Sequence, residues 1–131
     1  MAALPALSHV SLGTNDFPSA KRFYDAVLAT LGIRCVMDFD QGAGYGREFP
    51  EFWVQLPIDG ASANPGNGTH VCFNAATVEQ VKAFHQVALE QGAEDEGKPG
   101  LRKEYSENYF AAFVRDLDGH KVEAMCWVKQ G

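Results

Sequence analysis

The segment GTHVCFNAATVEQVKAFH, residues 68–85, reads as a second copy of LSHVSLGTNDFPSAKRFY, residues 7–24. His9 and His70 are 61 positions apart, and so are Phe23 and Phe84, each of which follows its histidine by fourteen residues. A repeat of this kind predicts two copies of one structural unit. If the two copies are equivalent in space, the two histidines are equivalent as well.

Length and composition indicate one compact domain built from these two units. The chain has 131 residues, of which 46% are hydrophobic and 11% aromatic, and this is enough to bury a core. We therefore expect a single domain over residues 1–131. It divides into a first module over about residues 6–58, a turn-rich linker over residues 59–67, and a second module over about residues 68–129.

Charge and hydropathy exclude several classes of partner. The net charge is −6 and the eleven Lys and Arg residues are scattered, so no nucleic acid partner is expected. No apolar run approaches the roughly 20 residues of a membrane span, and the start MAALPAL lacks the features of a leader peptide. The odd number of cysteines, three without a C-x-x-C pair, suits a reducing compartment. We expect a cytoplasmic protein without a membrane partner.

Each copy begins with a strand that leads into an amphipathic helix. In LSHVSL, residues 7–12, apolar and polar residues alternate, which is typical of a strand with one buried face. The following helix is expected to begin at an Asp16 N-cap and end at Gly32, and its repeat to begin at a Thr77 N-cap and end at Gly92. Further antiparallel strands complete each module.

The same alternation places four polar side chains on one face. If the apolar face of each sheet covers its helix, His9 and His70 point away from the helices. We align Gln55 in WVQL with Glu123 in KVEA, which places both on the histidines' face. The sequence therefore predicts a concave surface that carries His9, Gln55, His70 and Glu123.

Two imidazoles and a carboxylate form a suitable donor set for a divalent first-row metal, and an amide oxygen is a weaker fourth ligand. The alternative is a pair of strand histidines that are hydrogen-bonded within a cleft. Two further histidines have structural interpretations: His85 packs on the apolar face of its helix with one nitrogen satisfied, and His120 follows a tight turn and is expected at the surface.

Three segments carry a resemblance to a known family: HVSL with FYDAVLATLGI, HVCFNAATVEQVKAFHQVALEQGA, and YFAAFVRDLDGHKVEAM. Over nearly the whole chain they resemble the vicinal oxygen chelate superfamily, which includes glyoxalase I, bleomycin resistance proteins and extradiol dioxygenases. The resemblance implies an α+β fold of two tandem βαβββ modules that form a curved mixed sheet, with the helices outside and a concave metal or ligand cleft. It also implies metal ligands at His9, His70, Glu123 and Gln55.

The resemblance implies a lyase or isomerase, similar to glyoxalase I, in which zinc, nickel, cobalt, manganese or iron polarises a small oxygenated substrate and Glu123 moves a proton. Bacterial glyoxalase I usually has glutamate where this chain has Gln55, so the resemblance does not extend to a mechanism with two carboxylate bases. We expect five residues to contact the substrate: Trp53, Arg102, Tyr105, Tyr109 and Trp127.

Two alternatives remain from the sequence. One is a ring-cleaving type of dioxygenase with an iron site of two histidines and one carboxylate. The other is a bleomycin-resistance-like protein that binds a small molecule without catalysis. A homodimer is expected from the resemblance in each case.

Overall fold

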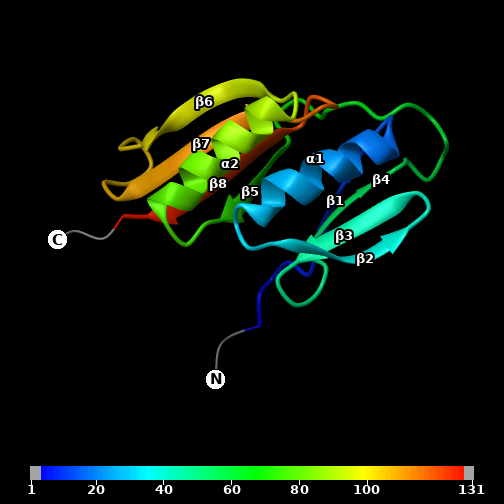
Figure 1. The fold of residues 1–131 in the computed structure, drawn as a ribbon, viewed down its shortest axis with the longest axis horizontal. Helices are drawn as coiled ribbons and strands as arrows, with labels where there is room; N and C mark the ends of the chain where they lie inside the picture. Colours follow the sequence, from blue (N-terminus) through cyan, green and yellow to red (C-terminus); the bar gives the residue numbers. More distant parts are fainter. Residues whose placement is uncertain (1–3, 129–131) are drawn as a thin grey trace.

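Two βαβββ modules follow one another along the chain, and the computed structural model describes them over residues 4–128 (Figure 1). The module end expected at residue 129 lies outside the described residues. The first module consists of β1 (Val10–Gly13), α1 (Phe17–Ala29), β2 (Arg34–Phe39), β3 (Gly42–Gly46) and β4 (Phe52–Gln55). The second consists of β5 (His70–Asn74), α2 (Val78–Glu90), β6 (Glu94–Leu101), β7 (Tyr109–Arg115) and β8 (Lys121–Trp127).

Each module forms its own four-stranded mixed sheet, and the strand order is the same in both. The orders are β1-β4-β3-β2 and β5-β8-β7-β6, with the first strand of each module parallel to the last and the other pairs antiparallel. The predicted duplication and fold are therefore confirmed. The two sheets are separate, because no strand of one module pairs with a strand of the other among the described residues.

The helices begin where the sequence predicts. The Asp16 side chain accepts a hydrogen bond from the backbone N–H of Ser19, and the Thr77 hydroxyl accepts one from the backbone N–H of Gln80. The helices end at Ala29 and Glu90, three residues before Gly32 and two before Gly92, and both glycines have left-handed backbone conformations. Neither helix in the described chain is long and apolar enough to cross a membrane.

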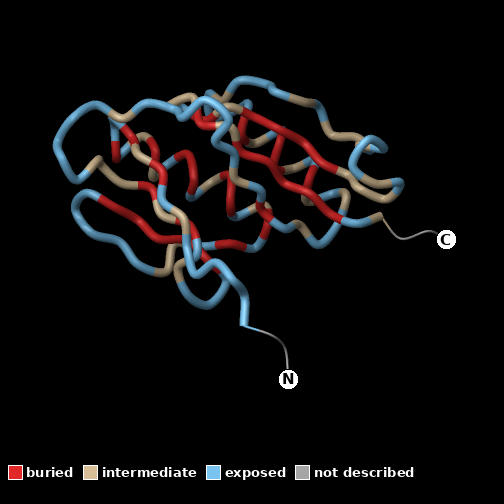
Figure 2. Tube along the Cα trace, turned by 180° about the vertical axis from the view of Figure 1, so that it is seen from behind, coloured by how far each residue is buried: buried red, intermediate tan, exposed pale blue. Residues whose placement is uncertain are grey.

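Both helices lie on the same side of the sheets and contact each other (Figure 1). Each covers the apolar face of its own sheet, and the buried segments of Figure 2 run along the strands and the helices beneath the exposed loops. The rings of Phe52 and Phe73 meet edge to face at 5.0 Å between their centroids and join the cores of the two modules. In the part of the chain that the structure describes, no helix lies on the opposite faces of the two sheets.

A tight turn of the second module docks on the first module. Asp116 accepts hydrogen bonds from the backbone N–H groups of Asp118 and His120 at 3.0 and 2.9 Å, which fixes the turn. His120 Nε2 then donates to the Gly13 carbonyl at 2.7 Å, and the Asp118 carboxylate accepts from the backbone N–H of Asn15 at 2.9 Å. The expectation that His120 lies at the surface is wrong. It is 5% exposed because the turn packs against the end of β1.

Candidate functional site

Glu123 is a buried carboxylate on the face of β8 that carries no helix. It is 2% exposed, and both of its oxygens are engaged. Oε1 lies 2.6 Å from His70 Nε2, and Oε2 accepts a hydrogen bond of 2.6 Å from the Tyr109 hydroxyl. The two strands that flank β8 therefore supply its partners, since His70 comes from β5 and Tyr109 from β7. A buried carboxylate needs such partners to be tolerated.

His70 connects this carboxylate to solvent. Its side chain is 39% exposed, whereas that of Glu123 is 2% exposed. The pair can hold and pass a proton between a buried oxygen and an accessible nitrogen. It can also offer one nitrogen and one oxygen donor to a metal ion that takes the place of the shared proton.

Two groups next to Glu123, the Cys72 thiol and the Tyr109 phenol, are uncharged at neutral pH. Desolvation raises the pKa of the Cys72 thiol to about 12, and the nearby Glu123 carboxylate adds to this effect. Desolvation and the hydrogen bond to Glu123 raise the pKa of Tyr109 above its usual value near 10. The Cys72 sulfur lies 4.0 Å from the Tyr109 hydroxyl oxygen. A neutral thiol and a neutral phenol therefore surround the acid.

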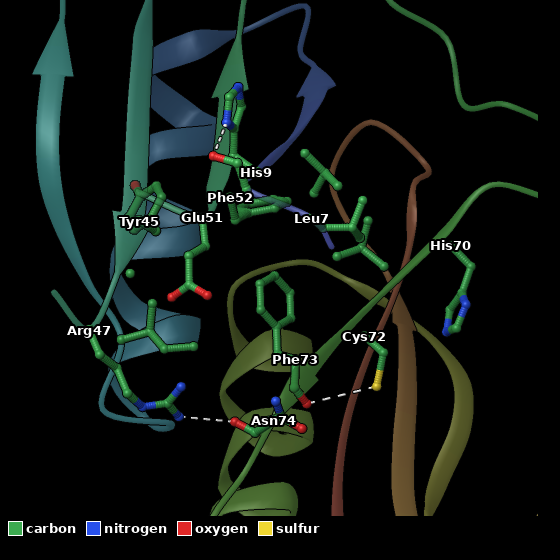
Figure 3. A pocket seen from close by; sticks show the side chains of 15 residues that line it. Leu7, His9, Tyr45, Arg47, Glu51, Phe52, His70, Cys72, Phe73 and Asn74 are labelled. Carbon is green, nitrogen blue, oxygen red and sulfur yellow. Dashed lines mark hydrogen bonds between the residues drawn. The ribbon is translucent and has the colours of Figure 1, made fainter. Parts of the chain in front are cut away.

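His9 lies apart from this pair. It precedes β1, is exposed, and has its Nδ1 3.0 Å from the hydroxyl oxygen of Ser8. His9 and His70 line a cavity of about 300 Å³ between the modules, but their rings do not point toward one another (Figure 3). Within residues 4–128, no three His, Cys, Asp or Glu side chains are grouped so that they could hold a metal ion. A single chain thus brings together only His70 and Glu123 of the predicted ligands.

The strand register changes the assignment of Gln55. In the second module, Glu123 pairs with the residue two places after His70. In the first module, the residue two places after His9 is Ser11, and Ser11 pairs with Trp53. Trp53 is therefore the structural counterpart of Glu123, and Gln55 stands two residues farther along β4. The alternation of WVQL predicted the correct face of the sheet for Gln55. The alignment of WVQL with KVEA was displaced by two residues, because Trp53 and not Gln55 stands at the position of Glu123.

The predicted aromatic residues lie on the faces that carry no helix. Trp53 stacks on Phe39 of β2, with ring centroids 6.0 Å apart and planes 4° apart. In the second module, Tyr109 makes edge-to-face contacts with Tyr105 at 5.2 Å and with Trp127 at 5.4 Å. Tyr109 was expected to line the cleft, and its hydroxyl also positions Glu123, a contact that sequence spacing gives no means of finding.

Arg102 follows β6 and folds back over the same face of the second sheet. Its guanidinium carbon lies 5.4 Å from the centre of the Phe113 ring. Lys121 of β8 places its ammonium nitrogen 5.1 Å from the same centre. Arg102 was predicted from the sequence as a substrate contact, whereas Phe113 and Lys121 were not. The available signal was the alternation of β8, which puts Lys121 on the same face as Glu123.

Comparison with known proteins gives a family match over most of the chain. The family model described as Glyoxalase/Bleomycin resistance protein/Dioxygenase superfamily matches residues 6–124. No curated protein matches the chain in sequence.

Solved structures share the fold over nearly the full length. A glyoxalase/bleomycin resistance protein from Albidiferax ferrireducens T118 is 36% identical, with a TM-score of 0.84 over 92% of this chain and 98% of that one. A glyoxalase-related enzyme from Fulvimarina pelagi is 19% identical, with a TM-score of 0.71 over 93% of this chain and 88% of that one. A glyoxalase/bleomycin resistance protein/dioxygenase family enzyme from Burkholderia phytofirmans PsJN is 17% identical, with a TM-score of 0.67 over 90% and 95%. The last two similarities concern the fold alone.

Proposed function

The chain belongs to the glyoxalase/bleomycin resistance protein/dioxygenase superfamily, and from this premise we propose that it is a divalent-metal-dependent lyase or isomerase that acts on a small oxygenated molecule. The observation that carries the proposal is the contact of 2.6 Å between His70 Nε2 and Glu123 Oε1. An imidazole nitrogen and a carboxylate oxygen in contact, on a face without a helix, are two donors of the kind that zinc, nickel, cobalt, manganese and iron(II) accept.

The donor types fit a metal, but catalytic sites of this kind use about three protein ligands. One chain brings only two of the predicted ligands, His70 and Glu123, into contact within residues 4–128. We propose that a second copy of the chain supplies His9, with Gln55 as a weaker oxygen ligand, so that the first-module face of one copy meets the second-module face of its partner. A two-fold symmetric dimer forms this pairing twice.

Exposed aromatic side chains on both faces support the pairing. Phe39 on the first sheet is 61% exposed, and Trp127 on the second is 63% exposed. Each contacts a predicted site aromatic, since Phe39 stacks on Trp53 and Trp127 touches Tyr109. Large apolar side chains grouped on an open face are typical of surfaces that another molecule covers.

In this mechanism, a bound metal supplies Lewis acidity toward a substrate oxygen. The chain supplies the proton transfer. Tyr109 donates a hydrogen bond to Oε2 of Glu123, so Oε1, beside His70, is the oxygen that would hold the metal. The Glu123 carboxylate is the proposed base that accepts a proton from a substrate carbon and returns it, with Oε2 as the oxygen left for this role. His70 adjoins Oε1 and is open to solvent in a single chain, and the pairing of two copies would let the aromatic side chains of both faces exclude water from the reacting atoms.

A second candidate is an iron(II) oxygenase. The register observation favours it, because Trp53 occupies the place where a second carboxylate would stand. The shared site would then consist of two histidines and one carboxylate, the donor set of non-haem iron oxygenases. Oxygen consumption by the iron(II)-loaded protein in the presence of catechols would distinguish this chemistry from isomerisation.

The proposal is tested by metal titration of chelator-treated protein. A metal at about 100 times its Kd adds roughly 2.7 kcal/mol to the stability, which for a chain of this size raises Tm by roughly 5 to 10 °C. His70→Ala should weaken the binding at least about tenfold. The matched control is Asn74→Ala, an exposed position on the same strand, which should bind as the wild type does. A wild type that none of the five metals stabilises would contradict the proposal.

A further inference from the structure

Two cations lie against one buried ring on the second sheet. Phe113 of β7 is 6% exposed, with Arg102 approaching from the β6 side and Lys121 from β8. Both basic side chains are half-buried, so they are partly desolvated while still open to solvent. Cations placed over an aromatic ring are attracted by its negative face, which holds them in position.

The backbone of β6 is shaped to admit Arg102. The guanidinium donates hydrogen bonds to the carbonyls of Lys98 at 2.7 Å and Gly100 at 3.0 Å. A Cβ at Gly97 would lie 3.0 Å from Phe113 and 3.1 Å from the guanidinium, and one at Gly100 would lie 3.2 Å from the guanidinium. Two glycines thus leave the space that the arginine occupies, which makes its position a feature of the fold.

Neither cation is neutralised. Among the carboxylates of residues 4–128, none forms an ion pair with Arg102 or Lys121. A guanidinium has five N–H donors, of which Arg102 commits two to carbonyls, and no hydrogen bond engages the ammonium of Lys121 within the described chain. Two positive charges therefore face solvent with donors available, on a protein whose net charge is −6.

These cations adjoin the His70–Glu123 pair. The ring of His70 lies 6.1 Å from that of Phe113, and Lys121 pairs directly with His70 in the parallel register of β5 and β8. An anionic group bound here would therefore place the rest of a small molecule next to His70, on the face where the proposed chemistry occurs.

We propose that Arg102 and Lys121 form an anion-binding subsite that takes the carboxylate of a small organic acid. As the substrate-recognition part of the site, this rests on the proposed function, and it assigns the substrate class as a small oxygenated acid. Fixed guanidinium and mobile ammonium donors are both suited to a carboxylate. The neighbouring aromatic side chains of Tyr105, Tyr109 and Trp127 provide a wall for an apolar part of the same molecule.

The test uses chelator-treated protein, so that anion binding is measured apart from any metal. Benzoate and its neutral isostere benzamide are titrated by calorimetry at low ionic strength. We expect benzoate to bind the wild type at least about tenfold more tightly than benzamide, because a charge-assisted hydrogen bond contributes that much. Lys121→Met keeps the stem over Phe113 and removes the charge, and it should weaken benzoate binding about tenfold. Arg102→Met should do the same.

The matched control is Lys82→Met, which removes an exposed positive charge from α2 on the far side of the sheet. It should leave benzoate affinity within about twofold of the wild type, since exposed distant charges are screened by salt. Equal affinity for benzoate and benzamide, no saturation by benzoate, or equal behaviour of Lys121→Met and Lys82→Met would each overturn the subsite. A protein that binds benzoate in this way but no metal would retain the subsite and lose the metal-dependent function.

Discussion

Tyr109 determines how Glu123 is presented. The carboxylate is almost fully buried, and the phenol satisfies the oxygen that His70 does not touch. Tyr109→Phe removes only the hydroxyl and leaves a buried oxygen without a partner. The free energy of unfolding should fall by about 1 to 3 kcal/mol, as measured by urea denaturation.

Tyr105→Phe is the control for this substitution, because Tyr105 is 60% exposed and its hydroxyl makes no hydrogen bond within the described residues. It should change the stability by less than about 0.5 kcal/mol. Equal effects of the two substitutions would mean that, for the protein in solution, the Tyr109 hydroxyl does not form the hydrogen bond to Glu123.

His85 shows how the same helix position is used differently in the two copies. Where the first copy has Tyr24, the second has His85, which is buried and has its Nε2 2.9 Å from Asp95 Oδ1. The expectation that His85 packs on the apolar face with one satisfied nitrogen is confirmed. The hydrogen bond from His85, followed by one from the backbone of Gly97, lowers the pKa of Asp95 below its usual value near 3.8.

This lowered pKa predicts a pH dependence of stability. A carboxyl whose pKa is lower in the folded than in the unfolded state stabilises the fold above about pH 4, and this contribution disappears as the pH falls through the folded value. Asp95→Asn should therefore be less stable than the wild type at pH 6, and the difference should shrink toward pH 2. Urea unfolding at several pH values measures this. Asp38→Asn, at an exposed carboxylate, should show no such convergence.

At the scale of single residues, the sequence predicts the face of a side chain better than its partners. Alternation placed His70 and Glu123 on one face, and the structure brings them into contact. The surface position expected for His120 was wrong, because a turn gives no periodic signal for burial and the docking of that turn depends on the other module. The contact of Tyr109 with Glu123 depends on strand register, which alternation does not determine.

Among the elements, β6 is one of the strands that alternation of apolar residues did not predict. Its sequence EDEGKPGL contains a proline, two glycines and four charged residues, and it has no alternation of apolar side chains. It forms because β7 offers a pairing edge, and two register shifts accommodate the irregular backbone. As the outer strand of its sheet, it has one edge that no strand within residues 4–128 pairs with, and proline is tolerated at such an edge. The same irregularity gives Arg102 its space.

The turn between β7 and β8 is one of the contacts that join the two modules. His120→Ala removes the hydrogen bond to the Gly13 carbonyl and leaves a cavity, so it should lower the unfolding free energy by about 2 to 4 kcal/mol. His9→Ala, at an exposed histidine, is the control and should change stability by less than about 0.5 kcal/mol. Thermal or urea unfolding compares the two. A small effect at His120 would mean that other contacts suffice to dock the modules.

For the whole molecule, the repeat predicted what each module looks like but not how the two modules pack. Each copy has the same strand order, so the pattern of apolar residues determined each module. The residues that join the modules, such as Phe52 and Phe73, also belong to the core in which the sheets pack against the helices. A hydrophobic pattern therefore cannot distinguish a packing that unites His9 with His70 from one that leaves them apart.

A shared site between two copies predicts complementation. His9→Ala and His70→Ala should each bind little metal as pure dimers, because every site lacks one histidine. In a mixed dimer, the His70→Ala chain supplies an intact His9 to the intact His70 and Glu123 of the other chain, so one of the two sites is complete. Random mixing gives about half mixed dimers, and therefore about a quarter of the wild-type metal content.

Metal content per chain after co-refolding measures this recovery, and light scattering determines whether the particle has twice the chain mass of 14.3 kDa. The control mixes His70→Ala with His70→Ala, Asn74→Ala, which shares the defect and should recover nothing. If all ligands came from one chain, each mutant chain would carry its own defect and mixing would restore no site. Recovery therefore tests the sharing of ligands directly, because it requires that two different chains contribute to one metal ion.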